Sequence, residues 1–391
     1  MNPDLAVLRP KAERCWEVAS DLGRHLHPEV LAAVAGAVRT VNCYYSNLIE
    51  GHDTRLAEID RAIRKDYSGD PARRNLQKEA LAHIEVQTLI ERRLDREPEL
   101  NVYGTEFLTW VHREFYERLP EEFRWIADPA TGRREPVRPG ALRHHDVRVG
   151  AHVPPAPAEL ERALGRFAEA YDPRGRSGIE NVALAGAAHH RLLWIHPFGD
   201  GNGRVTRLMS DALMRRAGMK GHGLWTVSRG LARARGRYKE LLAGADAEKW
   251  NDYDGRGALS LKGLGEFADF FLEVCLDQVT FMHEVLKVDA LGERLEKYVS
   301  GRANGFLPPP PGGVERLRPE LAPFMRDLAL LGTIPRAEAP RRMGVEVWTA
   351  RRILAGATAE GLIVSESTRA PLRLALPSPV ATVVLPGVYG N

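Results

Sequence analysis

Helical periodicity extends through most of the first 290 residues, and it constrains the fold more than any other feature of this sequence. Apolar side chains recur at spacings of three and four, as they do between Val30 and Val41, which is the pattern of a helix with one buried face. Residues 134–157 instead contain prolines, glycines and alternating valines, which predict a short strand or hairpin between loops. We therefore expect a mostly all-α protein. The predicted helices cover residues 58–67, 75–94, 104–119, 158–171, 177–195, 204–217, 229–243 and 261–288.

The end of the chain has a different residue pattern. Four consecutive prolines, Pro308–Pro311, lie in a Pro/Gly linker at 301–315 and predict a stiff spacer. Three short helices and two strands follow, and this order predicts a winged-helix (α+β) domain at 316–391. The chain then divides into an N-terminal helical region (1–100), a central core (101–290), the linker and this tail.

Composition excludes several classes of protein. Hydrophobic residues make up 44% and charged residues 27%, which is the balance of a globular chain and not of a disordered or collagenous one. The first residues lack an apolar signal core, and no stretch approaches the roughly 18 apolar residues of a membrane span. Three cysteines are too few for a disulfide framework. We therefore expect a cytoplasmic protein without membrane contact.

Residues 196–207, His-Pro-Phe-Gly-Asp-Gly-Asn-Gly-Arg-Val-Thr-Arg, join two predicted helices. Pro197 disfavours the α conformation at His196, so the first helix ends with the imidazole at the mouth of a turn. Glycines at 199, 201 and 203 let the backbone turn tightly and approach a ligand closely. The loop leads into the N-terminus of the next helix, whose free N–H groups attract anions. The backbone of this stretch is therefore suited to a phosphate.

The charged side chains of the same stretch point to transfer chemistry. Arg204 and Arg207 are three residues apart on one helical face, so both guanidinium groups reach the same phosphate chain. Asp200 is a hard oxygen ligand, which beside phosphates holds Mg²⁺ in preference to zinc. His196 supplies a base near neutral pH. Together these residues indicate a phosphate-binding, metal-assisted transfer site with a histidine base.

Each part of this stretch has a plainer interpretation when it is taken alone. A Gly-rich turn is usually structural, a lone histidine is usually satisfied or exposed, and two arginines usually form a solvated face. The stretch also lacks the Gly-Lys-Ser/Thr of a P-loop and the preceding strand of a dinucleotide fold. A zinc cluster of His189, His190 and His196 is disfavoured because adjacent helical residues point about 100° apart. Only the joint pattern within twelve residues favours a function.

These twelve residues match the Fic family motif, His-x-Phe-x-Asp/Glu-Gly-Asn-Gly-Arg-x-x-Arg, at every specified position. The chain thus resembles a Fic protein over about residues 31–288, with the core at 101–290. The resemblance implies a helical core with a small β-hairpin flap, and transfer of AMP from ATP to a Ser, Thr or Tyr hydroxyl of a target protein, itself included. It implies that His196 is the base, that Phe198 anchors the loop in the core and that Asp200 binds Mg²⁺. It also implies that Gly201, Asn202 and Gly203 form the anion cradle. Arg204 would then contact a phosphate, and Arg207 the γ-phosphate.

Two segments outside the motif resemble parts of the nucleotide and target sites. Residues 143–155 stand where the family has its flap, a β-hairpin that pairs with the target backbone. Tyr238 and Asp246 stand where relatives line the adenine pocket, often with Tyr-Tyr and Asn, and the departures at Arg237 and Asp246 leave the nucleotide choice open. The flap residues implied to lie near the nucleotide are Val147, Arg148, Val149 and Gly150.

A third segment, Ser46-Asn-Leu-Ile-Glu50-Gly51, fits the family's inhibitory pattern Ser/Thr-x-x-x-Glu-Gly/Asn. Gly51 is the expected C-terminal cap of its helix. The resemblance implies that Glu50 pairs with Arg207 and holds the enzyme inactive.

Several alternatives stay open at this stage. The group transferred could be a phosphate, UMP or phosphocholine, although the kinase-like variant usually has lysine where this chain has Gly203. A rival function is a transcription regulator whose body senses nucleotide and whose winged helix binds DNA. The tail carries ten arginines against six acidic residues, which permits DNA binding, protein docking or a homodimer without choosing among them. The arginines on its second and third helices are Arg341, Arg342, Arg351 and Arg352.

Overall fold

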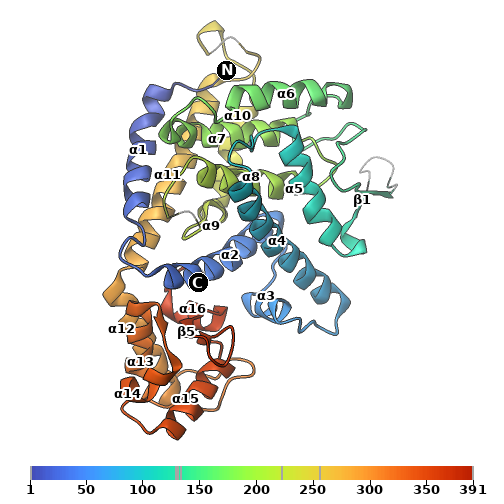
Figure 1. Cartoon of the computed structure of the whole chain (residues 1–391). Helices are drawn as coiled ribbons and strands as arrows, with labels where there is room; N and C mark the ends of the chain where they lie inside the picture. The colour runs from blue at the N-terminus through green and yellow to red at the C-terminus, as the bar shows by residue number, and fades with distance from the viewer. Residues whose placement is uncertain (1, 128–131, 133, 222, 255–256, 390–391) are drawn as a thin grey trace. The chain divides into compact units, whose positions relative to one another are not determined.

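The computed structural model describes residues 2–127, 132, 134–221, 223–254 and 257–389. The chain forms two compact units. The first comprises Met1–Ser20, Asn42–His222 and Thr226–Val279, and the second comprises Asp21–Val41, Gly223–Trp225 and Thr280–Asn391. Figure 1 follows the chain through both units by colour.

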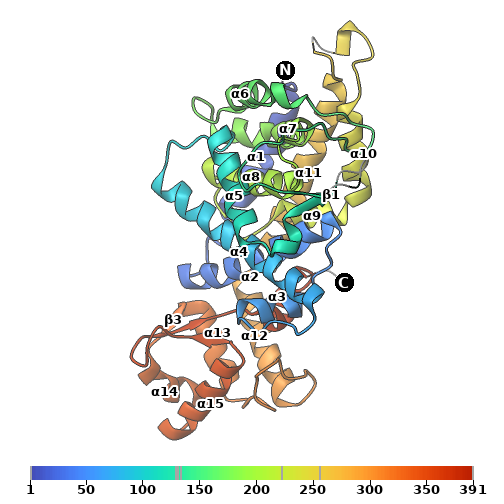
Figure 2. The same ribbon diagram turned by 90° about the vertical axis from the view of Figure 1, so that its right-hand side faces the viewer.

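The first unit is helical, which confirms the fold class that periodicity predicts. Its α8 contacts α4, α5, α7 and α9, and Figures 1 and 2 both show α7 and α8 lying among the surrounding helices. α7 is buried on almost every side. Its start is set by local sequence, because Ser177 and Glu180 form a capping box. The helices are α1 (Leu5–Asp21), α2 (Pro28–Glu50, whose residues 42–50 lie in this unit), α3 (Leu56–Ile63), α4 (Pro71–Arg96), α5 (Thr105–Arg118), α6 (Leu160–Tyr171), α7 (Gly178–Ile195), α8 (Asn202–Arg216), α9 (Val227–Arg233), α10 (Arg235–Asp246) and α11 (Leu261–Val285).

The strands of the first unit differ from the expected hairpin. β2 (Arg134–Pro136) is a short strand at the start of the stretch 134–157, as predicted, but it pairs antiparallel with β1 (Trp125–Ala127), upstream of the expected flap. Within residues 143–155 the pairing consists of one isolated bridge between Val149 and His152, in the described part of the chain. The two prolines that end this segment have no N–H to donate to a ladder, which limits its pairing. The flap is therefore a loop with a narrow turn and not a regular hairpin.

The second unit combines helices with a three-stranded antiparallel sheet in the order β3–β5–β4. Its elements α13, α14, α15, β4 and β5 follow one another in the predicted order, and β3, which was not predicted, lies between α13 and α14. The winged-helix assignment, and contacts with DNA or a second copy, stay predictions. The bounds are α12 (Val288–Ala303), α13 (Leu321–Leu331), β3 (Thr333–Ile334), α14 (Ala339–Met343), α15 (Val347–Ala359), β4 (Ile363–Val364), β5 (Leu372–Leu374) and α16 (Ser378–Val384).

The predicted linker at 301–315 lies inside the second unit. α12 was not expected, and the first residues of the linker belong to its last turn. The side chain of Arg302 is fully buried, forms an ion pair with Glu360 at 2.5 Å and donates to the carbonyl of Val314 at 2.6 Å. The prolines therefore belong to a segment that packs against its own unit. Within the described ranges, each helix is too short or too polar to cross a membrane.

Candidate functional site

The loop between α7 and α8 is held by its own side chains. The N–H of His196 donates to the carbonyl of Leu192 at 3.1 Å, the last helical bond of α7. His196 itself adopts a left-handed conformation, with φ of 49°, and this ends the helix before Pro197, which disfavours a helical residue ahead of it. Phe198 is 1% exposed and stacks on His112, with ring centroids 4.1 Å apart. The amide of Asn202 accepts from the N–H of Phe198 at 3.0 Å and donates to its carbonyl at 2.9 Å. The side chain of Asn202 therefore closes the loop and leaves the anion-binding role to the backbone.

The imidazole of His196 is a neutral base in this structure. Burial lowers the pKa of His196 to about 4, and the charge of Arg143 acts in the same direction. A hydrogen bond to the backbone of Leu193 opposes this shift and orients the ring. A neutral imidazole at pH 7 has a nitrogen free to accept a proton.

Asp200 is ionised and partly open. Burial alone would raise the pKa of Asp200, but the charge of Arg204 and a hydrogen bond from Tyr116 outweigh it and lower the pKa. The Tyr116 hydroxyl donates to Oδ2 at 2.7 Å, and the side chain stays 43% exposed. His112 accepts from the N–H of Gly140 at its Nδ1, so its Nε2 carries the proton and donates to the carbonyl of Asp200 at 3.2 Å. An oriented, ionised carboxylate of this kind suits a hard divalent cation.

Arg204 is paired with a carboxylate that sequence analysis did not find. Glu79, from α4, is 0% exposed and forms an ion pair with Nη1 of Arg204. The other oxygen of Glu79 bonds Nδ1 of His52 at 2.7 Å. The Nε of Arg204 has no hydrogen-bond partner among the described residues. Glu79 belongs to the buried face of α4, and the sequence around it carries no signal for this pairing.

Arg207 is surrounded by the end of α2. Its Nε donates to Oγ of Ser46 at 2.9 Å, and its Nη2 donates to the carbonyl of Ser46 at 3.1 Å and to Oε1 of Glu50 at 2.6 Å. Gly51 follows with φ of 93°, the left-handed conformation that ends the helix. The Arg207 side chain is 3% exposed, and Ser46 and Glu50 of α2 together accept three of its hydrogen bonds.

The carboxylate of Glu50 lies where an anion would bind the loop. A Cβ added to Gly203 would collide with Oε1 of Glu50, so this carboxylate rests against the backbone at the start of α8. Burial would raise the pKa of Glu50, but the charges of Arg207 and Arg204 outweigh it and keep the pKa below its ordinary value. Glu50 is therefore charged, and it repels any other anion at this point.

Of the two residues predicted to line the adenine pocket, Tyr238 contacts Arg207, whereas Asp246 contacts α7. Tyr238 is 4% exposed, and its hydroxyl bonds both Arg207 and Nε2 of His189, the latter at 2.9 Å. Asp246 accepts from Nε2 of His190 at 2.9 Å, on α7. The surface that Tyr238 offers to a ligand is thus small. The flap residues at 147–150 lie at and beside the bridge of Val149, whose side chain is 43% exposed.

Arg143 is a second residue that sequence analysis did not single out. It is 4% exposed, and its Nε donates to the carbonyl of His196 at 2.8 Å. Its two terminal nitrogens donate to the carbonyls of His145, at 3.0 Å, and Pro155. One guanidinium therefore joins both ends of the flap to the residue that carries the base.

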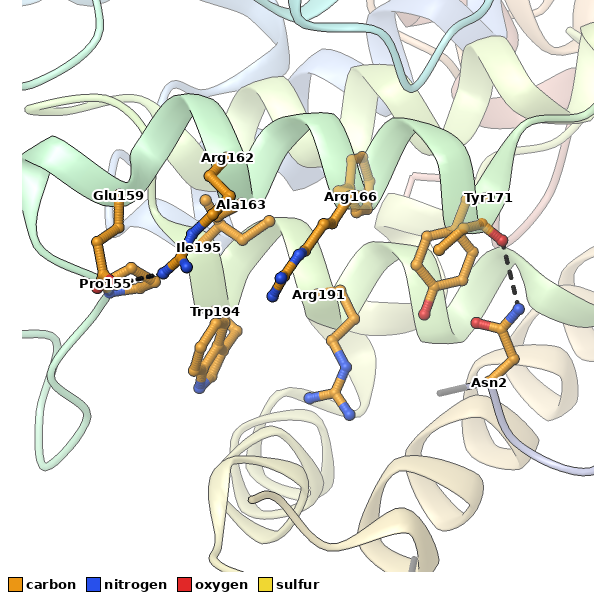
Figure 3. A pocket seen from close by; sticks show the side chains of 12 residues that line it. Asn2, Pro155, Glu159, Arg162, Ala163, Arg166, Tyr171, Arg191, Trp194 and Ile195 are labelled. Atoms are coloured by element: carbon orange, nitrogen blue, oxygen red, sulfur yellow. Dashed lines mark hydrogen bonds and ion pairs between the residues drawn. The ribbon is translucent and has the colours of Figure 1, made fainter. Parts of the chain in front are cut away.

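A separate pocket of about 340 Å³ lies between α6 and α7. No residue of 196–207 lines it, although Ile195 does. Figure 3 shows Arg166 extending from α6 toward α7, between Trp194 and Arg191, while Arg162 pairs with Glu159. This pocket is distinct from the loop that holds His196 and the two arginines of α8.

Comparisons with known proteins find the loop within a stretch that matches a family model. Residues 102–214 match the model of the Fic/DOC family. An 87-residue stretch is 41% identical to the protein adenylyltransferase Fic of Drosophila virilis and 40% identical to that of Drosophila melanogaster. Each alignment covers 22% of this chain and 18% of the relative, so it spans under a fifth of the length of these curated proteins.

Two solved structures share the fold at low sequence identity. A Fic-domain signalling protein of Bacteroides thetaiotaomicron has a TM-score of 0.51 at 20% identity, over 71% of this chain and 96% of that one. A Fic protein of C. elegans has a TM-score of 0.54 at 17% identity, over 73% and 74%. At these sequence identities, the two similarities show the fold alone.

Proposed function

Because residues 102–214 match the model of the Fic/DOC family, we propose that this chain is a protein adenylyltransferase that Glu50 holds in an inactive state. It transfers AMP from ATP to a hydroxyl group of a target protein. The observation that carries the proposal is the pairing of Glu50 with Arg207 against Gly203, in the anion position of the loop.

The loop and α8 provide the contacts that a triphosphate needs. The N-terminus of α8 offers backbone N–H groups, and Arg204 and Arg207 flank it. Asp200 is the residue that would hold Mg²⁺, whose charge would offset that of the phosphates. Its ionised, partly exposed carboxylate fits this role.

His196 supplies the proton transfer. Its neutral ring accepts the proton of the target hydroxyl, and the resulting oxygen nucleophile forms a bond to the α-phosphorus. The bond from that phosphorus to the bridging oxygen breaks, and pyrophosphate leaves. The low pKa of His196 keeps the ring unprotonated, and therefore able to act as base, throughout the neutral range.

The flap is the proposed contact with the target. Val149 and Val153 are 43% and 59% exposed, so both apolar side chains are accessible to a target segment. An extended target segment that paired with this loop would place its hydroxyl near His196, because Arg143 joins the loop to the carbonyl of that residue.

Glu50 opposes this reaction by pairing with Arg207, the residue proposed to bind the γ-phosphate. Holding the site about 99% closed requires roughly 2.7 kcal/mol. A charge pair with one partner 3% exposed reaches this range. The same guanidinium serves the closed and the open state, so its loss cannot activate the enzyme.

The test uses ATP labelled at the α- or the γ-phosphate. Glu50→Gly and Glu50→Gln should both raise transfer of the α-label to protein, while Arg207→Ala should be inactive with or without Glu50. Glu97→Gly is the matched control, because Glu97 also ends a helix but is exposed and pairs with Arg93. Transfer of the γ-label alone would indicate a kinase, and equal α-labelling by wild type and both Glu50 variants would refute inhibition by Glu50.

A further inference from the structure

We propose that Glu135, His144 and His145 form a binding site for a zinc-class transition metal ion at the base of the flap. This site is separate from Asp200 and does not depend on the proposed activity. The three side chains offer one carboxylate oxygen and two imidazole nitrogens, and these atoms all lie within 4.8 Å of one another.

The distances between the donors fit an ion better than they fit direct bonds. Oε2 of Glu135 lies 3.6 Å from Nε2 of His144 and 3.7 Å from Nδ1 of His145. Both separations exceed a hydrogen bond. Ligands at about 2.0–2.2 Å from a tetrahedral zinc ion are roughly 3.3–3.6 Å apart, so a small closure of the three side chains would complete the arrangement.

One donor atom lacks any other partner. The Nδ1 atom of His145 is buried and makes no hydrogen bond to a described residue. Burying a polar atom without a partner costs free energy, so such an atom needs an explanation. A metal ion at the focus of the three side chains would provide one.

The backbone holds the donors in place without help from an ion. Glu135 lies in the middle of β2, where it pairs with Ile126 of β1. Arg143, which also bonds His196, donates to the carbonyl of His145 at 3.0 Å. The rings of His144 and His145 meet edge to face, with centroids 5.2 Å apart. Two separate segments of the chain therefore present their ligands to one point.

The donor set selects the class of metal. Two nitrogens and one carboxylate oxygen are typical zinc ligands, whereas Mg²⁺ and Ca²⁺ prefer oxygen alone. A pocket of about 120 Å³ that these residues line, together with Gly199 of the catalytic loop, has room for a water molecule as fourth ligand. A bound ion would join β2 to the base of the flap.

The alternative is that one or both imidazoles are protonated and pair with the carboxylate as ions. Metal binding separates these interpretations, because it requires neutral imidazoles and fails when one ligand is removed. Substituting any single ligand should then reduce affinity for zinc, whereas groups that serve only as ion pairs would leave the chain without retained zinc.

The experiment measures zinc retained by the full-length, tag-free chain. Protein stripped with a chelator is equilibrated with one equivalent of Zn²⁺ at pH 7.5, and the zinc per chain is measured by mass spectrometry after buffer exchange. Wild type should retain close to one ion, and His144→Ala and Glu135→Gln should each weaken binding at least about tenfold. Because both residues are at least partly exposed, the melting temperature of the zinc-free variants should equal that of zinc-free wild type.

Two control variants show where the zinc is held. His25→Ala removes an exposed histidine of the second unit, and Asp200→Ala removes the carboxylate of the catalytic loop. Both should retain zinc as wild type does. Wild type that retains no zinc, or zinc that is lost in either control but kept in His144→Ala, would overturn the proposal.

Discussion

Replacing Glu79 by alanine removes the main acceptor of Arg204 from the interior of the first unit. The two side chains are 0% and 7% exposed, so solvent does not screen their interaction. The other polar neighbours of Arg204 are the Tyr116 hydroxyl and Oδ2 of Asp200, both at 3.4 Å. Both contacts are longer than the Glu79 pair, and the one with Asp200 is an ion pair that persists when Glu79 is removed, while the Nε of Arg204 already has no partner among the described residues.

The magnitude follows from this burial. Removing one partner of a buried ion pair costs about 3–5 kcal/mol, because the remaining charge stays buried after its shortest ion pair is lost. His52 also loses its bond to Glu79, but its side chain is 38% exposed, so water replaces much of that interaction. We therefore expect Glu79→Ala to lower the free energy of unfolding by about 3–5 kcal/mol. Glu79→Gln should cost less, because its amide oxygen still accepts from Arg204.

The assay is urea unfolding followed by circular dichroism and by tryptophan fluorescence. Glu85→Ala is the matched control: Glu85 lies on the same helix and pairs with Arg118 at 3.3 Å, but these side chains are 50% and 31% exposed. That exposed pair should be worth less than about 1 kcal/mol. Variants are compared only where both probes give one transition and the slopes agree. A loss for Glu79→Ala as small as that for Glu85→Ala would refute the reasoning.

Three further outcomes concern catalysis, each measured as α-label transfer in the Glu50→Gly background. His196→Ala should reduce transfer by about 10²–10⁴-fold and leave ATP affinity, measured by calorimetry, unchanged; weaker ATP binding in a folded variant would make His196 a binding residue. Because burial lowers the pKa of His196 to about 4, the base is protonated only as pH falls through that value. The rate should therefore be level from pH 8 to about 5 and then decline, and a decline centred near pH 6.5 would contradict the low pKa. Arg143→Met should slow transfer to the target at unchanged ATP affinity, since the flap and the carbonyl of His196 lose their common donor, and full activity would show that this contact is dispensable.

Local sequence determined much of the helical architecture and the shape of the loop at 196–207. Periodicity marks the helices of the first unit, and the capping box of Ser177 and Glu180 sets the start of α7. Pro197 ends that helix, and Gly201 takes the positive φ from which α8 begins. These features depend on residues only a few positions apart, so they can be predicted from the chain alone. The flap is the exception, because its alternating valines predict a hairpin that its prolines prevent.

The pairing of charges in the site was decided by the tertiary structure. Glu79 and Arg204 are 125 residues apart in sequence, and Glu50 and Arg207 are 157 apart. The second pair was expected only because residues 46–51 resemble a family pattern, and nothing in the sequence near Glu79 indicates the first. Such contacts form where packing brings distant helices together and leaves no water to solvate a charge.

A buried charge also decides where the predicted linker packs. Pro308–Pro311 are stiff whether or not they separate two domains. The sequence therefore predicts that this segment is stiff, but it does not predict what the segment packs against. What places them inside the second unit is Arg302, whose buried guanidinium takes its acceptors from Glu360 and from the carbonyls of the loop that the prolines begin. Local chemistry can be read along the chain, whereas the partner of a buried charge depends on which distant segment lies against it in the folded protein.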